Sequence, residues 1–392
     1  MPIEDVAAEA LRLLEHRGLL RDLRTVSSAT DCWVDLGGRR TLLLCSNNYL
    51  GLANHPTLVA AAADAAARWG VGAGASRLIS GSLALHHQLE TEIASWKRAE
   101  AAVLFNSGYH ANVGTIAALV GEGDAIFSDA LNHASIIDGC RLSRARVVVY
   151  PHNDVNALES ELARVPARHR LIVTDSVFSM DGDMAPLREI CELAERYDAW
   201  VMVDEAHATG VLGPTGAGLV EQLGLHERVA VQMGTLGKAL GCFGAFVAAR
   251  RDVVRLLVNR ARSLVFTTAL PPPVVGAALA AVRLVRAEPE RRARLQANAR
   301  VLHAELQRMG APVPVAPSHI LPVVLGNEAR TMECSARLLE RGVWVQGIRP
   351  PTVPPGTARL RATVMATHSE DDLRFAASAF ASVFCEEAHE RS

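Results

Sequence analysis

The chain has 392 residues, of which 49% are hydrophobic and 21% are charged, and its formal net charge is −2. This length and apolar content suit one large domain with a smaller one, or two domains of moderate size. The nearly balanced charge argues against a nucleic-acid-binding surface, which needs a clustered basic excess.

The cysteines and the lengths of the apolar runs argue against disulfide-rich, secreted and membrane proteins. The seven cysteines are odd in number, scattered and without a C-x-x-C pair, so we expect neither a disulfide framework nor a metal site. Reduced cysteines are typical of the cytoplasm, and residues 1–20 lack the basic start and apolar block of a signal peptide. No apolar run reaches about 18 residues without a charge, so we expect no membrane span.

The middle of the chain alternates helical patterns with short apolar runs. Amphipathic helices are predicted over 1–20, 86–98 and 186–197. Continuous apolar strands separated by helices indicate a mostly parallel sheet that is covered on both faces. The predicted strands are 101–105, 125–129, 146–150, 171–175, 200–207 and 229–234.

The pattern changes near residue 275. One long helix is predicted over roughly 274–309, followed by strands near 319–325 and 358–364 and helices near 329–341 and 370–385. We therefore expect an α/β fold with three parts. These are an N-terminal helix and strand segment (1–49), a large domain (50–285) and a small C-terminal α+β domain (286–392).

The segment DEAHATG (204–210) follows an apolar strand. Open α/β sheets bind ligands at the carboxyl ends of their strands, so Asp204 and His207 are candidate site residues. A carboxylate that ends a buried strand needs a partner, and a protonated pyridine nitrogen would provide one. A capping aspartate followed by a surface histidine is the alternative interpretation.

The segment GTLGKALG (234–241) places a lysine among small residues after the next strand. Lysine forms Schiff bases with carbonyl cofactors, and Thr235 could donate to a phosphate. Alone, Lys238 also fits an ordinary loop lysine beside turn glycines. An acid-ended strand followed by Ser/Thr-x-x-Lys is, however, the order found in fold-type I pyridoxal-phosphate enzymes, which Asp204 and Lys238 resemble.

Three further segments follow strands in the same way. Gly108 and Tyr109 begin a helix in NSGYHAN, and the N-terminus of a helix binds phosphate well. His133 in LNHAS could stack on a flat ring, although a plain loop histidine is the alternative. Ser179 and Asp181 lie in DSVFSMDGD. The recurrence of such residues at successive strand ends predicts one composite site.

From about residue 10 to 375 the sequence resembles the α-oxoamine synthases, a family of pyridoxal-phosphate enzymes that join an amino acid to an acyl thioester with loss of carbon dioxide. The motifs that carry the resemblance include SNNYLGL (46–52), GASRLISG (74–81), TTALPP (267–272) and IRPPTVPPGTARLR (348–361), together with the segments above. The last stretch resembles the branch that uses L-alanine and a pimeloyl thioester in biotin biosynthesis.

The resemblance implies roles around the cofactor. Lys238 would carry pyridoxal phosphate as a Schiff base, Asp204 would keep the pyridine nitrogen protonated, and His133 would stack on the ring. Ser179 and His207 would lie near the phenolic oxygen of the cofactor.

It also implies roles at the phosphate. Gly108, Tyr109 and Thr235 would cradle this group. Thr267 or Thr268 would reach the phosphate of the other subunit's cofactor, because sites in this family lie at the interface of a homodimer.

Substrate contacts follow from the same resemblance. Arg361 and Asn47 would hold the amino-acid carboxylate, whereas Arg21 and Thr352 match positions that contact substrate. The acyl carrier, coenzyme A or acyl carrier protein, is left open.

Two positions depart from the expected branch, because Cys45 and Asn48 in CSNNYLG resemble the 2-amino-3-ketobutyrate ligases. Another α-oxoamine synthase is therefore an alternative interpretation. A fold-type I aminotransferase is a less favoured alternative, since it would share Asp204 and Lys238 but would lack RPPTVPPGTARLR. A binding protein without catalysis is the least favoured, because Lys238 is present.

Overall fold

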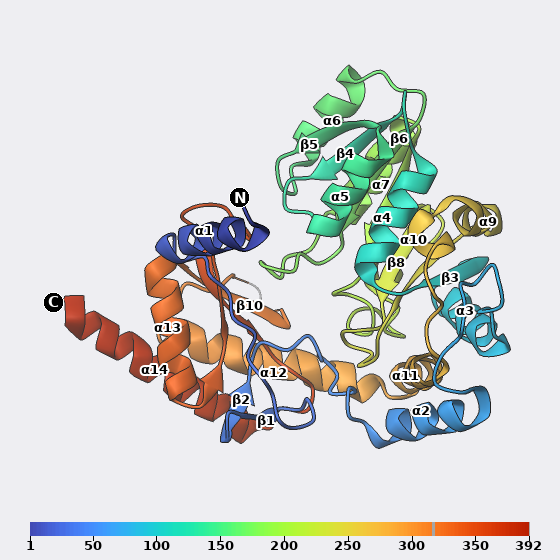
Figure 1. Cartoon of the computed structure of the whole chain (residues 1–392). Helices are drawn as coiled ribbons and strands as arrows, with labels where there is room; N and C mark the ends of the chain where they lie inside the picture. Colours follow the sequence, from blue (N-terminus) through green and yellow to red (C-terminus); the bar gives the residue numbers. More distant parts are fainter. Residues whose placement is uncertain (316–317, 392) are drawn as a thin grey trace.

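Figure 1 shows the computed structural model, which describes residues 1–315 and 318–391. A large unit is built on a sheet with helices packed around it, and a smaller unit holds both chain termini. Helix α12 (Pro289–Arg308) runs through the small unit toward α11 (Pro272–Ala287) of the large one. This arrangement confirms the predicted α/β fold.

A seven-stranded sheet in the order β3-β9-β8-β7-β6-β4-β5 organises the large unit. Neighbouring strands are parallel except at β9, which is antiparallel to both β3 and β8. The sequence prediction missed β9, because AFVAA is rich in alanine, which has a low strand propensity. The strands are β3 (Ala101–Phe105), β4 (Ala125–Asp129), β5 (Arg146–Tyr150), β6 (Arg170–Asp175), β7 (Ala199–Asp204), β8 (Val231–Thr235) and β9 (Ala245–Ala249).

Each face of the sheet has its own hydrophobic core. Along β7, Val201 and Val203 belong to one cluster and Met202 to the other, as expected when successive side chains point to opposite faces. The covering helices are α2 (Pro56–Trp69), α3 (Ala84–Trp96), α4 (Gly108–Leu119), α5 (Ala134–Ser143), α6 (Val155–Arg164), α7 (Leu187–Arg196), α8 (Leu219–Leu223), α9 (Arg251–Arg260), α10 (Arg262–Val265) and α11.

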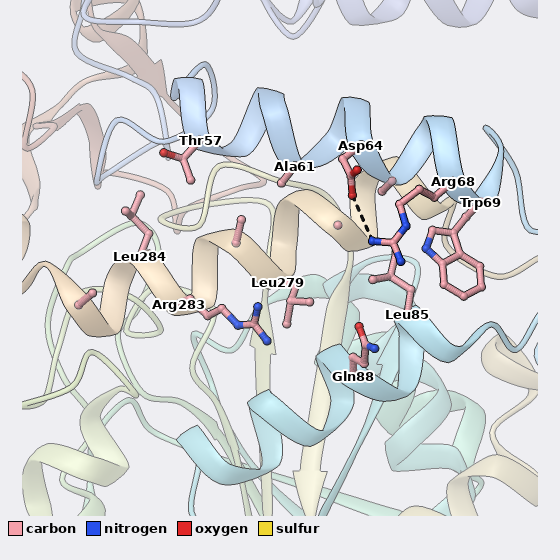
Figure 2. Close-up of a pocket in the computed structure, with 14 residues that line it drawn as sticks. Thr57, Ala61, Asp64, Arg68, Trp69, Leu85, Gln88, Leu279, Arg283 and Leu284 are labelled. Carbon is pink, nitrogen blue, oxygen red and sulfur yellow. Dashed lines mark ion pairs between the residues drawn. The ribbon is translucent and has the colours of Figure 1, made fainter.

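Helices α2 and α11 pack in close contact because Gly276 has no side chain. A Cβ at Gly276 would lie 2.6 Å from the Cβ of Ala65 and 2.9 Å from the carbonyl oxygen of Ala61. A cavity of about 560 Å³ lies beside this contact, and the guanidinium of Arg68 lies 3.6 Å from the carboxylate of Asp64 there. Figure 2 shows the side chains that line this cavity. The residues predicted for the site do not line this cavity.

The predicted single helix over 274–309 is wrong in one respect, because α11 ends at Ala287 and α12 begins at Pro289. Proline has no N–H to donate and its ring disfavours a helical conformation in the residue before it, so the helix must restart. Glu288 between the two helices has φ −117° and ψ 70°.

The small unit contains two three-stranded sheets, β1-β2-β11 and β10-β13-β12. Strand β2 pairs in parallel with β11, so the N-terminal strands join the C-terminal part of the chain. Among the described residues, no helix is long and apolar enough to cross a membrane. The elements of this unit are α1 (Ile3–His16), β1 (Trp33–Leu36), β2 (Arg39–Leu43), α12, β10 (Ile320–Gly326), α13 (Glu328–Glu340), β11 (Val343–Trp344), β12 (Gln346–Ile348), β13 (Ala358–Thr363) and α14 (Glu370–Arg391).

Candidate active site

The carboxyl ends of β6, β7 and β8 bring three ionisable side chains together. Asp175 ends β6 and Asp204 ends β7, and the two are opposite each other in the parallel register. Lys238 lies in the turn after β8. Asp175 was not predicted, although it ends an apolar strand as Asp204 does and could have been found by the same argument.

Asp204 is a buried carboxylate with no cation within ion-pair distance among the described residues. One of its oxygens accepts a hydrogen bond from the Asn112 amide at 2.7 Å, and the other accepts from the Ala206 N–H at 2.8 Å. Burial, and then repulsion by Asp204, raise the pKa of Asp175 well above its usual value. This favours a protonated Asp175 beside Asp204.

Lys238 contacts His207, with 2.8 Å between Nζ and the imidazole Nε2. Removal from bulk water lowers the pKa of Lys238 to about 8, although Asp204 and Asp175 oppose this change. Burial, and then the charge of Lys238, hold the pKa of His207 well below its usual value. A partly unprotonated amine beside a neutral imidazole is suited to act as a nucleophile or a base.

Two buried residues that were not predicted complete this cluster. The Tyr49 hydroxyl lies 2.7 Å from Nδ1 of His207, and it donates to Oδ1 of Asn47 at 3.0 Å. The His319 ring packs edge-on against Tyr49 at 4.4 Å between centroids. Tyr49 lies inside the SNNYLGL motif and could have been selected there, whereas no sequence pattern indicated His319.

Arg361 on β13 reaches the same cluster from the small unit. Its Nε donates to the carbonyl oxygen of Ser179 at 2.5 Å, and its Nη2 lies 3.3 Å from Oδ1 of Asn47. No carboxylate of the described residues pairs with this buried guanidinium. The structure thus brings Arg361 and Asn47 together, and an unpaired buried guanidinium is suited to bind the carboxylate of a ligand.

His133 precedes α5 and is held in place by that helix. Its ring Nδ1 accepts a hydrogen bond from the backbone N–H of Ser135 at 3.2 Å, and the backbone N–H of His133 donates to the carboxylate of Asp175 at 2.8 Å. Ser135 in turn accepts from Asn112, the amide that also binds Asp204. The predicted stacking residue therefore belongs to the hydrogen-bonded network around Asp204.

The residues predicted for a phosphate lie at the starts of α4 and of the loop after β8. Gly108 is the first residue of α4, whose N-cap is Ser107. The Tyr109 hydroxyl donates to Asp138 at 2.5 Å, and the Thr235 hydroxyl donates to the Gly244 carbonyl at 3.1 Å. Both hydroxyls thus have protein partners, so the backbone N–H groups of α4 are the more available donors.

The TTALPP segment lies against two other motifs. Asn106 donates to the hydroxyl of Thr267 at 3.0 Å and to the carbonyl of Thr268 at 2.9 Å. Thr268 also forms a β-bridge with Ser76 of GASRLISG. Because Thr268 is exposed in the single chain, its side chain is available to a second subunit.

A cavity of about 700 Å³ joins the predicted substrate residues to the cluster. Arg21, Thr352, His133 and Ser179 all line it. Nη2 of Arg21 lies 3.4 Å from the Thr352 hydroxyl. Residues separated by 331 positions in the chain therefore border one cavity with His133.

These residues fit pyridoxal phosphate. Asp204 is a buried carboxylate without a cation, which a protonated pyridine nitrogen would supply. Lys238 is an amine that is partly unprotonated near neutral pH, as a Schiff-base lysine must be. The start of α4 offers backbone N–H groups to the phosphate.

Comparisons with known proteins agree with this geometry. The family model for aminotransferase class I and II matches residues 39–380. A protein of Anaeromyxobacter dehalogenans (strain 2CP-1 / ATCC BAA-258) named 8-amino-7-oxononanoate synthase is 57% identical over 358 residues, 91% of this chain and 90% of its own length. The protein of the same name from Geobacter sulfurreducens is 54% identical over 380 residues, 96% of this chain and 97% of its own.

Solved structures give the same family. A serine palmitoyltransferase of S. paucimobilis, solved with a PLP adduct bound, is similar with a TM-score of 0.93 and 32% identity, covering 97% of each chain. An 8-amino-7-oxononanoate synthase from Francisella tularensis has a TM-score of 0.77 and 27% identity, covering 89% of this chain and 99% of its own. The chain therefore belongs to the aminotransferase class I and II family and, within it, to the α-oxoamine synthases.

Proposed function

We propose that the chain is a pyridoxal-phosphate-dependent 8-amino-7-oxononanoate synthase. It condenses L-alanine with a pimeloyl thioester and yields 8-amino-7-oxononanoate, carbon dioxide and the free carrier thiol, a step of biotin biosynthesis. The observation that carries the proposal is the unpaired, buried Arg361, which shares Asn47 and Tyr49 with the Lys238–His207 pair. A carboxylate-binding group thus lies in the same network as a candidate base.

Pyridoxal phosphate, when bound, supplies a sink for the electrons left on the α-carbon of the amino acid. Lys238 takes the α-proton, which suits an amine whose pKa is lowered to about 8. Asp204 keeps the pyridine nitrogen protonated. Arg361 and Asn47 hold the amino acid by its carboxylate, as a planar two-pronged donor and an amide can.

The acyl half of the reaction is assigned to the neighbouring residues. His207 is positioned to stabilise negative charge that develops on the acyl carbonyl oxygen, in the manner of an oxyanion hole. Arg21 and Thr352 contact the acyl substrate from the cavity that they share with His133. Ser179 borders the same cavity, and its hydroxyl would hydrogen-bond the cofactor near its phenolic oxygen.

Assembly as a homodimer is part of the proposal. Thr268 would contact the cofactor phosphate of the other subunit. Phe266, two residues before it, is 71% exposed, and Phe243 is 54% exposed. A two-fold symmetric interface would cover such a surface. Sedimentation at micromolar protein should give about twice the chain mass of 42.0 kDa, and an active monomer would contradict this part.

The reaction is tested by adding L-alanine with pimeloyl-CoA, pimeloyl-acyl carrier protein and thioesters of other chain lengths. Release of the carrier thiol, with the mass of the amino-ketone product, is expected from a pimeloyl donor. Conversion of alanine to pyruvate without thiol release would instead indicate an aminotransferase. Product formed from another acyl chain alone would indicate a different α-oxoamine synthase.

A further inference from the structure

A continuous line of hydrogen bonds links the reactive lysine to the carboxylate-binding pocket. Nζ of Lys238 lies 2.8 Å from Nε2 of His207, and Nδ1 of the same ring lies 2.7 Å from the Tyr49 hydroxyl. That hydroxyl reaches Oδ1 of Asn47 at 3.0 Å and accepts from Arg361 at 3.4 Å. Tyr49 is fully buried, so water does not replace these partners.

The direction of the line follows from the donors available. A charged Lys238 can only donate, so Nε2 of His207 must accept from it and the ring proton must lie on Nδ1. Nδ1–H then donates to the Tyr49 oxygen, and the Tyr49 proton points to Asn47. Each group along the line therefore has a defined role while Lys238 is charged.

The surroundings keep His207 neutral, so its ring carries a single proton, on either Nδ1 or Nε2. The other groups that face His207 are Arg361 on β13, His319 before β10 and His133 before α5, and they add to burial and Lys238 in lowering its pKa. The charges of Asp204 and Asp175 raise the pKa of Lys238, whereas the charge of Arg361 lowers it.

We propose that Tyr49 is a positioning residue whose hydroxyl holds the ring proton of His207 on Nδ1, and so makes Nε2 an acceptor for Lys238. The hydroxyl thereby stabilises the charged form of Lys238 and sets how readily this lysine releases its proton. Without the hydroxyl, a proton on Nδ1 would be buried with no acceptor, which disfavours that tautomer. The other tautomer presents Nε2–H to Lys238, donor against donor.

The chain offers a direct test because it has only two lysines, Lys97 and Lys238. Protein labelled with ¹³C at the lysine ε-carbon, prepared without cofactor, gives one signal for each. In Tyr49→Phe the titration midpoint of Lys238 should fall by about one pH unit, the scale of one lost hydrogen bond to a charged group. The Lys97 signal should not move.

Tyr150→Phe is the matched control, since it removes the hydroxyl of another buried tyrosine at the end of β5. It should leave the Lys238 midpoint unchanged. An unchanged midpoint in Tyr49→Phe, or an equal fall in both variants, would overturn the proposal. The role in catalysis rests on the proposed function, but the measurement uses protein without cofactor or substrate, so the two can fail separately.

A measurement on the unmodified chain covers the case in which Tyr49→Phe does not fold. Protein labelled with ¹⁵N in its histidine rings reports which nitrogen carries the proton, and His207→Asn identifies the His207 signals by their loss. Below the pH at which Lys238 loses its charge, Nδ1 should be protonated and Nε2 should not. A proton on Nε2 in that range would overturn the proposal.

Discussion

The two lysines of the chain occupy opposite kinds of environment. Lys97 follows α3 and packs against the ring of Phe246 on β9, whereas Lys238 lies in the turn after β8. The residues that serve them are neighbours in sequence, since Asp204 faces the site of Lys238 and Glu205 faces Lys97. One turn after β7 thus separates a reactive lysine from a structural one.

Lys97 is saturated. Its ammonium is fully buried and donates to Glu205 at 2.5 Å, to the Thr209 hydroxyl at 3.2 Å and to the carbonyl of Ala217. The second oxygen of Glu205 accepts from the Val220 N–H at 2.9 Å. Every proton of this ammonium has an acceptor, which is what a buried ion pair requires to be stable.

In the described part of the chain, the amine of Lys238 has fewer hydrogen-bond partners than the ammonium of Lys97. His207 is its hydrogen-bond partner, and no carboxylate of the described residues lies within ion-pair distance. Burial without a paired anion lowers its pKa to about 8. Full pairing therefore makes Lys97 inert, whereas incomplete pairing leaves Lys238 reactive.

The largest difference is expected in cofactor attachment. Reducing the cofactor-loaded protein with borohydride should fix pyridoxal phosphate to the peptide of Lys238 and leave Lys97 unmodified, as peptide mass spectrometry can show. Only the neutral amine attacks the aldehyde, so the rate of attachment should rise with pH up to about 8 and then level off. Lys238→Ala should not turn over. Pyridoxal phosphate attached to Lys97 would contradict the claim that Lys238 alone of the two lysines is reactive.

The next largest effect is expected in stability. Lys97→Met leaves Glu205 buried without a counter-charge and should destabilise the fold by about 3–5 kcal/mol, measured by urea unfolding. The double variant Lys97→Met/Glu205→Gln should recover most of this loss, because no charge is left unpaired. Lys238→Met is the control and should change the free energy of unfolding by less than about 1 kcal/mol. Equal losses at both lysines would show that Lys238 is structural too.

Asp204 and Glu205 allow a finer separation of chemistry from stability. Asp204→Asn removes the charge that keeps the pyridine nitrogen protonated, so exchange of the α-proton of L-alanine should fall roughly 10²-fold. Proton NMR in deuterated water measures this exchange. Glu205→Gln, the matched change one residue later, should mainly reduce stability. Unchanged exchange in Asp204→Asn would place the nitrogen's partner elsewhere.

Most of the fold and the centre of the site could be predicted because their signals are local in sequence. Apolar runs mark the strands, and Asp204 and Lys238 lie directly after such runs, at an edge where parallel strands converge. The break before Pro289 has an equally local cause and could have been predicted from the residue itself.

The remaining features depend on contacts between distant segments. Tyr49 and Arg361 meet only because the N-terminal strands join the sheets of the small unit. Lys97 and Glu205 are 108 positions apart in the sequence, which hides their pairing. Strand β9 has weak local propensity and is held by β3 and β8 on either side. Tertiary packing decides such features, so the sequence pattern does not reveal them.

The smallest expected effect is on the binding of L-alanine by Arg361, a buried arginine without a carboxylate partner among the described residues. Two residues earlier on β13, Arg359 is likewise buried, but it pairs with the carboxylate of Asp181. Arg361→Lys keeps the charge but loses the planar fork, and should weaken L-alanine binding by about 1–3 kcal/mol. Titrating alanine while following the absorbance of the bound cofactor measures this affinity. Arg359→Lys, the matched change at a saturated arginine, should leave it nearly unchanged. Should alanine bind equally well to Arg361→Lys, Arg361 is a structural residue, and its lack of a carboxylate partner has another cause.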